Sequence, residues 1–171
     1  MRFHAALAAV ILAGCGGGSE PRPEPKAMAK AEPRAEPKAE ARPELMPAKI
    51  ADPEPEHVLV AHVLVAFDGA ARSKATRSKE AAEKLAYEML ARARKGEDFN
   101  KLIKDFSDDS GPGVYGMANH RISPFGDEYE RRKMAAAFGD VGFKLEVGSI
   151  GMSVYDPQKS PFGWHIIKRL K

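Results

Sequence analysis

A proline-rich run between residues 19 and 56 sets the strongest limit on how this chain can fold. The run holds nine of the chain's 13 prolines, no glycine and no aromatic residue, and it interleaves nine acids with seven bases. Such a composition cannot bury enough apolar surface to offset the entropy that is lost on ordering. Proline-rich chain favours extended polyproline II structure, at about 3.1 Å per residue. We therefore expect a semi-stiff tether, and we interpret it as a plain spacer rather than a specific binding segment.

The first fifteen residues, MRFHAALAAVILAGC, have the pattern of an export signal. Arg2 precedes an apolar run from Ala5 to Ala13, and small residues lead to Cys15. The apolar run is too short to cross a bilayer as a helix, which needs roughly 20 residues. The stretch LAGC, residues 12–15, is similar to a bacterial lipobox, in which the cysteine is acylated and becomes the mature N-terminus. The alternative is an ordinary secretory signal that happens to contain a cysteine.

Cys15 is the only cysteine, so the chain can form no internal disulfide and no cysteine-based metal site. We expect a lipoprotein signal peptide over residues 1–14 and a Cys15-anchored tether over residues 15–56. Gly16, rather than aspartate, follows the cysteine, and by analogy with Gram-negative lipoproteins this indicates an outer-membrane anchor. The pattern does not determine the membrane face, and we expect the protein to face the periplasm. The net charge of +3 is small and distributed, so we expect no nucleic-acid partner.

Residues 57–171 carry every aromatic side chain except Phe3 and are expected to form one globular domain. Residues 57–67 are rich in valine and leucine without alternation, which indicates a strand buried on both faces. Ser78 is a helix cap ahead of apolar residues at helical spacing, and Lys95-Gly96 ends that helix. A shorter amphipathic helix is predicted over residues 99–106.

The second half of the domain predicts a short strand around Tyr115, an irregular stretch over residues 117–132 and a short helix over 132–138. Strands near residues 150–155 and 164–170 complete it. The order β-α-α-β-α-β-β predicts an α+β fold in which a four-stranded, mostly antiparallel sheet is flanked by helices.

The first strand repeats itself as HVLVAHVLV, with histidines at positions 57 and 62. Successive strand residues point to opposite faces, so at most one of the two can face a given site. A histidine in a buried strand is most often a hydrogen-bonded core residue. The sequence holds no nucleophile elbow, phosphate-binding glycine loop or metal-spaced cluster, and we expect no metal. Two histidines with Asp109 would form a polar network if the fold brought them together.

Four stretches, taken in order, resemble the parvulin-type peptidyl-prolyl cis-trans isomerases, whose sheet fold is FKBP-like. They are AHVLV at 61–65, FSDDS at 106–110, residues 134–148 with Met134, Phe138, Phe143, Leu145 and Gly148, and SPFGWHII at 160–167. The resemblance covers roughly residues 60–171. It assigns roles to seven positions: a polar network of His62, Asp109 and His165, with Ser160 beside it, and a proline-binding wall of Tyr115, Met134 and Phe138. Phe143 and Leu145 match core positions.

The resemblance implies an enzyme that accelerates rotation about X-Pro bonds of exported or envelope proteins, with no cofactor. Unaided rotation faces a barrier of ~18–20 kcal/mol, and no bond need break. A site complementary to the twisted amide is sufficient. Because Asp109 cannot act as an attacking thiolate, we expect a non-covalent mechanism. The implied partners are proline-containing polypeptides and, through the lipid anchor, a membrane; we expect a monomer.

Some residues depart from the family pattern. Residues 113–116 read GVYG in a segment where Tyr115 replaces the usual leucine, and Ala66 stands where the phosphate-reading branch places a basic residue. Arg72, Lys74 and Arg77 either contact an acidic or phosphorylated residue before proline or, as we prefer, form a solvated basic loop. Two other functions stay open: a catalytically silent domain that holds unfolded chains, and a structural envelope lipoprotein. His57 is interpreted as incidental, so replacing it should be nearly silent where replacing His62 is not.

Overall fold

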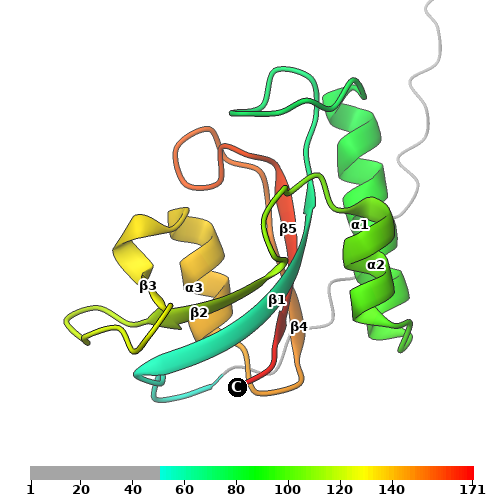
Figure 1. Ribbon diagram of the computed structural model, residues 1–171. Helices are drawn as coiled ribbons and strands as arrows, with labels where there is room; N and C mark the ends of the chain where they lie inside the picture. Colours follow the sequence, from blue (N-terminus) through cyan, green and yellow to red (C-terminus); the bar gives the residue numbers. More distant parts are fainter. Residues whose placement is uncertain (1–50) are drawn as a thin grey trace, which may run out of the picture. The chain divides into compact units, whose positions relative to one another are not determined.

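A computed structural model describes residues 51–171 (Figure 1). The expected signal peptide, Cys15 and the tether up to residue 50 lie outside the described residues. Nine elements follow one another along the described chain: β1 (His57–Val65), α1 (Lys79–Arg94), α2 (Phe99–Phe106), β2 (Val114–Ala118), β3 (Tyr129–Glu130), the 3-10 helix η1 (Arg131–Lys133), α3 (Ala136–Lys144), β4 (Ile150–Ser153) and β5 (Trp164–Arg169).

The strands form one sheet in the order β3-β2-β1-β5-β4, with β1 at its centre. Strands β1, β2, β4 and β5 are paired antiparallel, as the sequence predicts for four strands. The predicted α+β class and order of the main elements are therefore confirmed. The predicted strand count is too low by one, because two residues of the stretch expected to be irregular pair in parallel with Met117 and Ala118 as β3.

The helices cover the two faces of the sheet separately: α1 and α2 lie on one side and α3 on the other (Figure 1). Along β1, Ala61, Val63 and Val65 pack in the cluster that contains the α1 and α2 side chains. Val58 and Val60 pack in the second cluster, with residues of α3. Both faces of β1 are thus buried, as its valine- and leucine-rich sequence without alternation predicts. By the same alternation, His62 lies on the α3 face.

The ends of α1 follow from local chemistry. The Ser78 side chain accepts a hydrogen bond from the Ala81 amide at the N-terminus, and Gly96 has a φ of 91° just beyond the C-cap Lys95. A left-handed conformation of this kind is readily adopted only by glycine. The predicted start and end of this helix are confirmed, and α2 also begins and ends where its apolar spacing predicts.

The helix predicted over residues 132–138 is wrong in position. The chain makes the short η1, becomes extended at Met134 and Ala135, and only then forms α3. The sequence did not predict a helix at this position because the segment contains Gly139 and Gly142, and glycine disfavours helix interiors. Here they permit close packing: a Cβ at residue 139 would lie 3.0 Å from Cγ of Arg131, and one at residue 142 would lie 3.0 Å from Cε of Met117.

Residues 51–56, which the sequence interpretation gave to the tether, contact the domain in the structure. The Ala51 amide donates to the Lys144 carbonyl, and the Glu54 carboxylate lies 2.7 Å from a guanidinium nitrogen of Arg131. The Asn119 amide donates to the Glu56 carbonyl. Within residues 51–171, no helix has the length and apolar character needed to cross a bilayer.

Candidate active site

His62 and His165 lie side by side at the centre of the sheet. His165 is paired with Leu64 across β1 and β5, so it shares the face of His62. Their rings stack with centroids 5.4 Å apart, and the two Nδ1 atoms are separated by 3.3 Å. Only 3% and 5% of their respective surfaces are exposed. The pair is therefore a buried unit, built by strand pairing between residues 103 positions apart.

Asp109 reaches this pair from the loop that follows α2. Its Oδ2 lies 2.9 Å from Nε2 of His62 and accepts a 2.8 Å hydrogen bond from the Tyr115 hydroxyl, while its Oδ1 accepts from the Gly111 amide. The hydrogen bond with His62, assisted by those from Gly111 and Tyr115, holds the pKa of Asp109 well below its usual range. Burial and the neighbouring carboxylate raise the pKa of Tyr115. Asp109 is thus an ionised acceptor of three hydrogen bonds.

The two residues that precede Asp109 attach its loop to β1. The Ser107 hydroxyl accepts from the Leu64 amide, and the Asp108 carboxylate accepts from the Ala66 amide. Arg77 forms an ion pair with the same Asp108 carboxylate and donates to the Ala66 carbonyl. These contacts fix the loop on the strand that carries His62, which explains how Asp109 is held within hydrogen-bonding distance.

The histidines form a directional chain of hydrogen bonds. Burial, together with the nearby His62, lowers the pKa of His165 to about 3, so this imidazole is neutral. Because Asp109 is ionised, His62 donates from Nε2; in its neutral form it then accepts at Nδ1 from His165. This leaves Nε2 of His165 without a proton. That atom is buried and has no hydrogen-bond partner among residues 51–171.

A cavity of about 360 Å³ opens above this network. Phe138 contacts both histidines edge-on, with ring centroids 5.1 Å from His62 and 5.3 Å from His165. The Tyr115 ring lies 6.3 Å from that of Phe138, and Met134 borders the same space. Apolar side chains thus form one wall and hydrogen-bonded polar groups the floor. This arrangement suits a small apolar ring that is attached to a polar amide.

Six of the seven predicted site residues therefore border one cavity: His62, Asp109, Tyr115, Met134, Phe138 and His165. Ser160 does not border it. Its buried hydroxyl donates to the Gly163 carbonyl and shares a hydrogen bond with Ser153, which is paired with His165 across β4 and β5. Ser160 thus supports the turn before β5. The catalytic and binding roles of all seven residues remain predictions.

Sequence reasoning did not identify Leu64 and Phe162 as lining residues. Leu64 had a usable signal, since it lies two residues after His62 and so shares its face. The basic residues at the cavity rim are Arg72, whose guanidinium lies 5.9 Å from the Phe162 ring centroid, and Lys133. Arg77 instead pairs with Asp108.

His57 does not border the cavity around His62, and the expectation that its replacement is nearly silent stays a prediction. The structure adds contacts of His57 that the sequence did not indicate. His57 begins β1, and its Nδ1 lies 2.8 Å from Oε2 of Glu128. Its ring stacks on Phe125, with centroids 4.4 Å apart. The two histidines of the repeat therefore have different surroundings: His62 borders the cavity, and His57 contacts the loop after β2.

The described part of the chain holds no group of three or more side chains suited to bind a metal ion. The chemistry on offer is an apolar pocket, an ionised carboxylate and two imidazoles. Within the cavity lining, the Tyr115 hydroxyl donates to Asp109, whose lowered pKa makes it a poor base for activating that hydroxyl as a nucleophile. Binding and electrostatics are what the geometry provides.

Comparison with known proteins gives a matching family model and several relatives. A family model described as a PPIC-type PPIase domain matches residues 47–171. Foldase protein PrsA of Geobacillus kaustophilus is 40% identical over 78 residues, which cover 46% of this chain and 24% of the relative. Foldase protein PrsA of a second Geobacillus strain is 40% identical over 74 residues, or 43% and 23%.

Among solved structures, the peptidyl-prolyl isomerase ESS1 from Candida albicans matches with a TM-score of 0.52 and 19% identity, covering 68% of this chain and 63% of that one. This likeness concerns the fold. The chain spans about a quarter of the length of the curated relatives that it matches.

Proposed function

The chain belongs to the PPIC-type peptidyl-prolyl isomerase family, and from this premise we propose that the isomerase reaction takes place in the cavity above His62 and His165. The observation that carries the proposal is the convergence of six predicted residues, drawn from separate elements, on one space. The proline ring packs against Met134, Phe138 and Tyr115. The amide that precedes proline then lies over the hydrogen-bonded network.

The network acts on the amide through charge. A planar amide owes its rotational barrier of ~18–20 kcal/mol to a resonance form with negative charge on the carbonyl oxygen. An ionised Asp109 near that oxygen disfavours the charge-separated form and so lowers the cost of twisting. A thousandfold acceleration requires only about 4 kcal/mol of preferential stabilisation of the twisted state. The neutral, buried His165 keeps His62 oriented toward the carboxylate.

A protease-coupled assay on a short Ala-Pro peptide tests this proposal with the full chain. We expect clear acceleration over the uncatalysed rate, a loss of at least tenfold in His62→Ala, and unchanged activity in His120→Ala. His120 is a matched control because it lies exposed in the loop after β2. Circular dichroism establishes that each variant is folded. The absence of acceleration by the native chain would refute the proposal.

We further propose that the protein assists the folding of exported polypeptides in a bacterial envelope. The support is the export signal over residues 1–14, followed by Cys15 and the proline-rich segment to residue 56. Matched relatives carry the name foldase. On this proposal Cys15 is acylated and the chain is a monomer on the outer membrane, facing the periplasm, with no nucleic-acid partner.

Lipid attachment has a direct test. Cells that produce the native chain should incorporate labelled palmitate into it, and Cys15→Ser should release the protein into the soluble fraction. Continued lipid labelling of the Cys15→Ser variant would contradict the anchor. It would leave the isomerase assignment untouched.

A further inference from the structure

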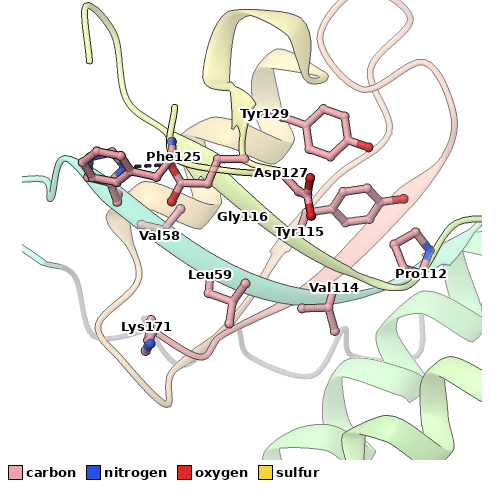
Figure 2. A pocket seen from close by; sticks show the side chains of 12 residues that line it. Val58, Leu59, Pro112, Val114, Tyr115, Gly116, Phe125, Asp127, Tyr129 and Lys171 are labelled. Carbon is pink, nitrogen blue, oxygen red and sulfur yellow. Dashed lines mark hydrogen bonds and ion pairs between the residues drawn. The ribbon is translucent and has the colours of Figure 1, made fainter. Parts of the chain in front are cut away.

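A second groove, of about 640 Å³, runs along β2 outside the cavity described above (Figure 2). Its lining is largely apolar and aromatic and includes Leu59, Pro112, Val114, Tyr115, Phe125 and Tyr129. Three of these side chains are exposed although they are large: Val114 by 37%, Tyr129 by 47% and Phe125 by 70%. We call this space the β2 groove. Such a grouping of exposed apolar side chains commonly marks an interaction surface.

The far wall of the β2 groove is held in place by specific contacts. The Glu128 carboxylate accepts a hydrogen bond from the Phe125 amide and contacts His57, on which the Phe125 ring stacks. Gly116 leaves room for the Glu128 side chain beside β2, because a Cβ at residue 116 would lie 2.9 Å from Cγ of Glu128. The exposed Phe125 ring is thus positioned by the fold, and His57 takes part in holding it.

The same groove follows an open sheet edge. β1 pairs with all of β2, whereas β3 pairs only with Met117 and Ala118. Residues 114–116 therefore have no strand partner on their outer side within the described chain. Unpaired strand edges accept an extended polypeptide as an added strand, and neighbouring side-chain pockets then select its residues.

Tyr115 connects this edge to the candidate active site, because it lines both spaces. Its ring centroid lies 6.3 Å from that of Phe138 and 5.7 Å from that of Tyr129. The Phe138 and Tyr129 rings are therefore at most about 12 Å apart, which about four residues of extended chain can cover. A polypeptide whose proline occupies the cavity would thus pass directly into the β2 groove.

We propose that the β2 groove binds the extended apolar segment next to the proline of the same substrate, so that an unfolded chain is held while its X-Pro bond rotates. This inference rests on the proposed function and extends it to a substrate class: proline flanked within about four residues by large apolar side chains. Charge agrees with an apolar occupant. Glu128 is paired with His57, and the other charged lining residues, Asp127 and Lys171, have opposite signs.

The test compares two twelve-residue peptides with one Ala-Pro centre in assays with the full chain. One peptide carries leucine and tyrosine three and four residues from the proline on both sides, and the other carries serine there. We expect kcat/KM to be at least fivefold higher for the apolar-flanked peptide. Phe125→Ala and Val114→Asp should each reduce that ratio to below two. Val154→Asp is the matched control and should keep the native ratio. Val154 is also an exposed valine, at 46%, but it lies after β4, at the other edge of the sheet.

Each other outcome decides against the proposal. Equal kcat/KM for both peptides, or a ratio unchanged in both groove variants, would show that the groove does not contact substrate. If sedimentation shows a native dimer that Val114→Asp converts to monomer, the edge is an interface between copies of the chain. Acceleration of the serine-flanked peptide in any of these cases leaves the proposed isomerase function intact, whereas no acceleration of either peptide overturns both.

Discussion

His62 and Asp109, 47 residues apart in the sequence, are joined by a contact of 2.9 Å between Nε2 of the imidazole and Oδ2 of the carboxylate. The contact places an ionised group at the floor of an apolar cavity, where electrostatic interactions are strong because water is partly excluded. Through His62 it also connects Asp109 to His165, whose Nδ1 lies 3.3 Å from Nδ1 of His62. The proposed mechanism therefore rests on one residue of the loop that follows α2.

Replacing Asp109 by asparagine removes the charge and keeps the shape. We expect kcat for a short proline peptide to fall at least tenfold while KM changes less than threefold, because the charge acts on the twisted amide. Asp105→Asn is the matched control; that aspartate lies on α2, exposed, and pairs with Lys101. Native kcat in Asp109→Asn would rule out the electrostatic mechanism.

Stability should decline on acidification, beginning near neutrality. The pKa of His165 is lowered to about 3 in the folded state by burial, against about 6.5 in an unfolded chain. The unfolded state thus binds more protons between these values, and the free energy of unfolding falls by up to about 1.4 kcal/mol per pH unit. The lowered pKa of Asp109 adds a further loss below about pH 4.

Urea unfolding at pH 7.5, 5.5 and 4.5 measures this dependence. His165→Asn cannot take up the proton, so its unfolding free energy should vary less over that range than that of the native chain. An equal pH dependence in both proteins would contradict the assignment of a neutral, buried His165.

Phe138 and Phe143, both on α3, can be compared to distinguish an effect on substrate binding from an effect on core packing. Both are buried at 2% exposure or less, but only Phe138 borders the cavity. We expect Phe138→Leu and Phe143→Leu each to destabilise the fold by about 1–3 kcal/mol. Only Phe138→Leu should raise KM, by at least fivefold, in the peptide assay. Similar KM values in the two variants would place the proline ring elsewhere.

Glu54 tests whether the domain begins before β1. Its carboxylate pairs with Arg131, which is 8% exposed and also contacts Asp140. Glu54→Gln should lower the free energy of unfolding by about 1 kcal/mol, because a charged hydrogen bond to a buried guanidinium is weakened. Glu56→Gln, at an exposed position two residues on, serves as the control. Identical unfolding curves for the two variants would show that the contact of Glu54 with Arg131 does not stabilise the domain, as expected if residues 51–56 belong to the tether.

Much of the fold was predictable because local signals agreed with it. The Ser78 cap, the Gly96 stop and the apolar spacing of α1 and α2 act over a few residues, and the structure confirms them. The family suggested by four stretches is confirmed by the matching family model. The position of α3 was mispredicted because Gly139 and Gly142 meet a tertiary packing requirement that a local pattern cannot express.

The sequence by itself predicted the order of the main elements, and the resemblance of four stretches to a known family predicted six of the residues that border the cavity. It could not determine distances between residues that are far apart along the chain. Only the tertiary structure gave the 2.9 Å contact between Asp109 and His62, and only it showed that Ser160 lies away from the cavity and that His57 stacks on Phe125. The reason is physical: strand alternation fixes the face of a side chain, whereas its partners depend on strand pairing and loop packing over the whole domain.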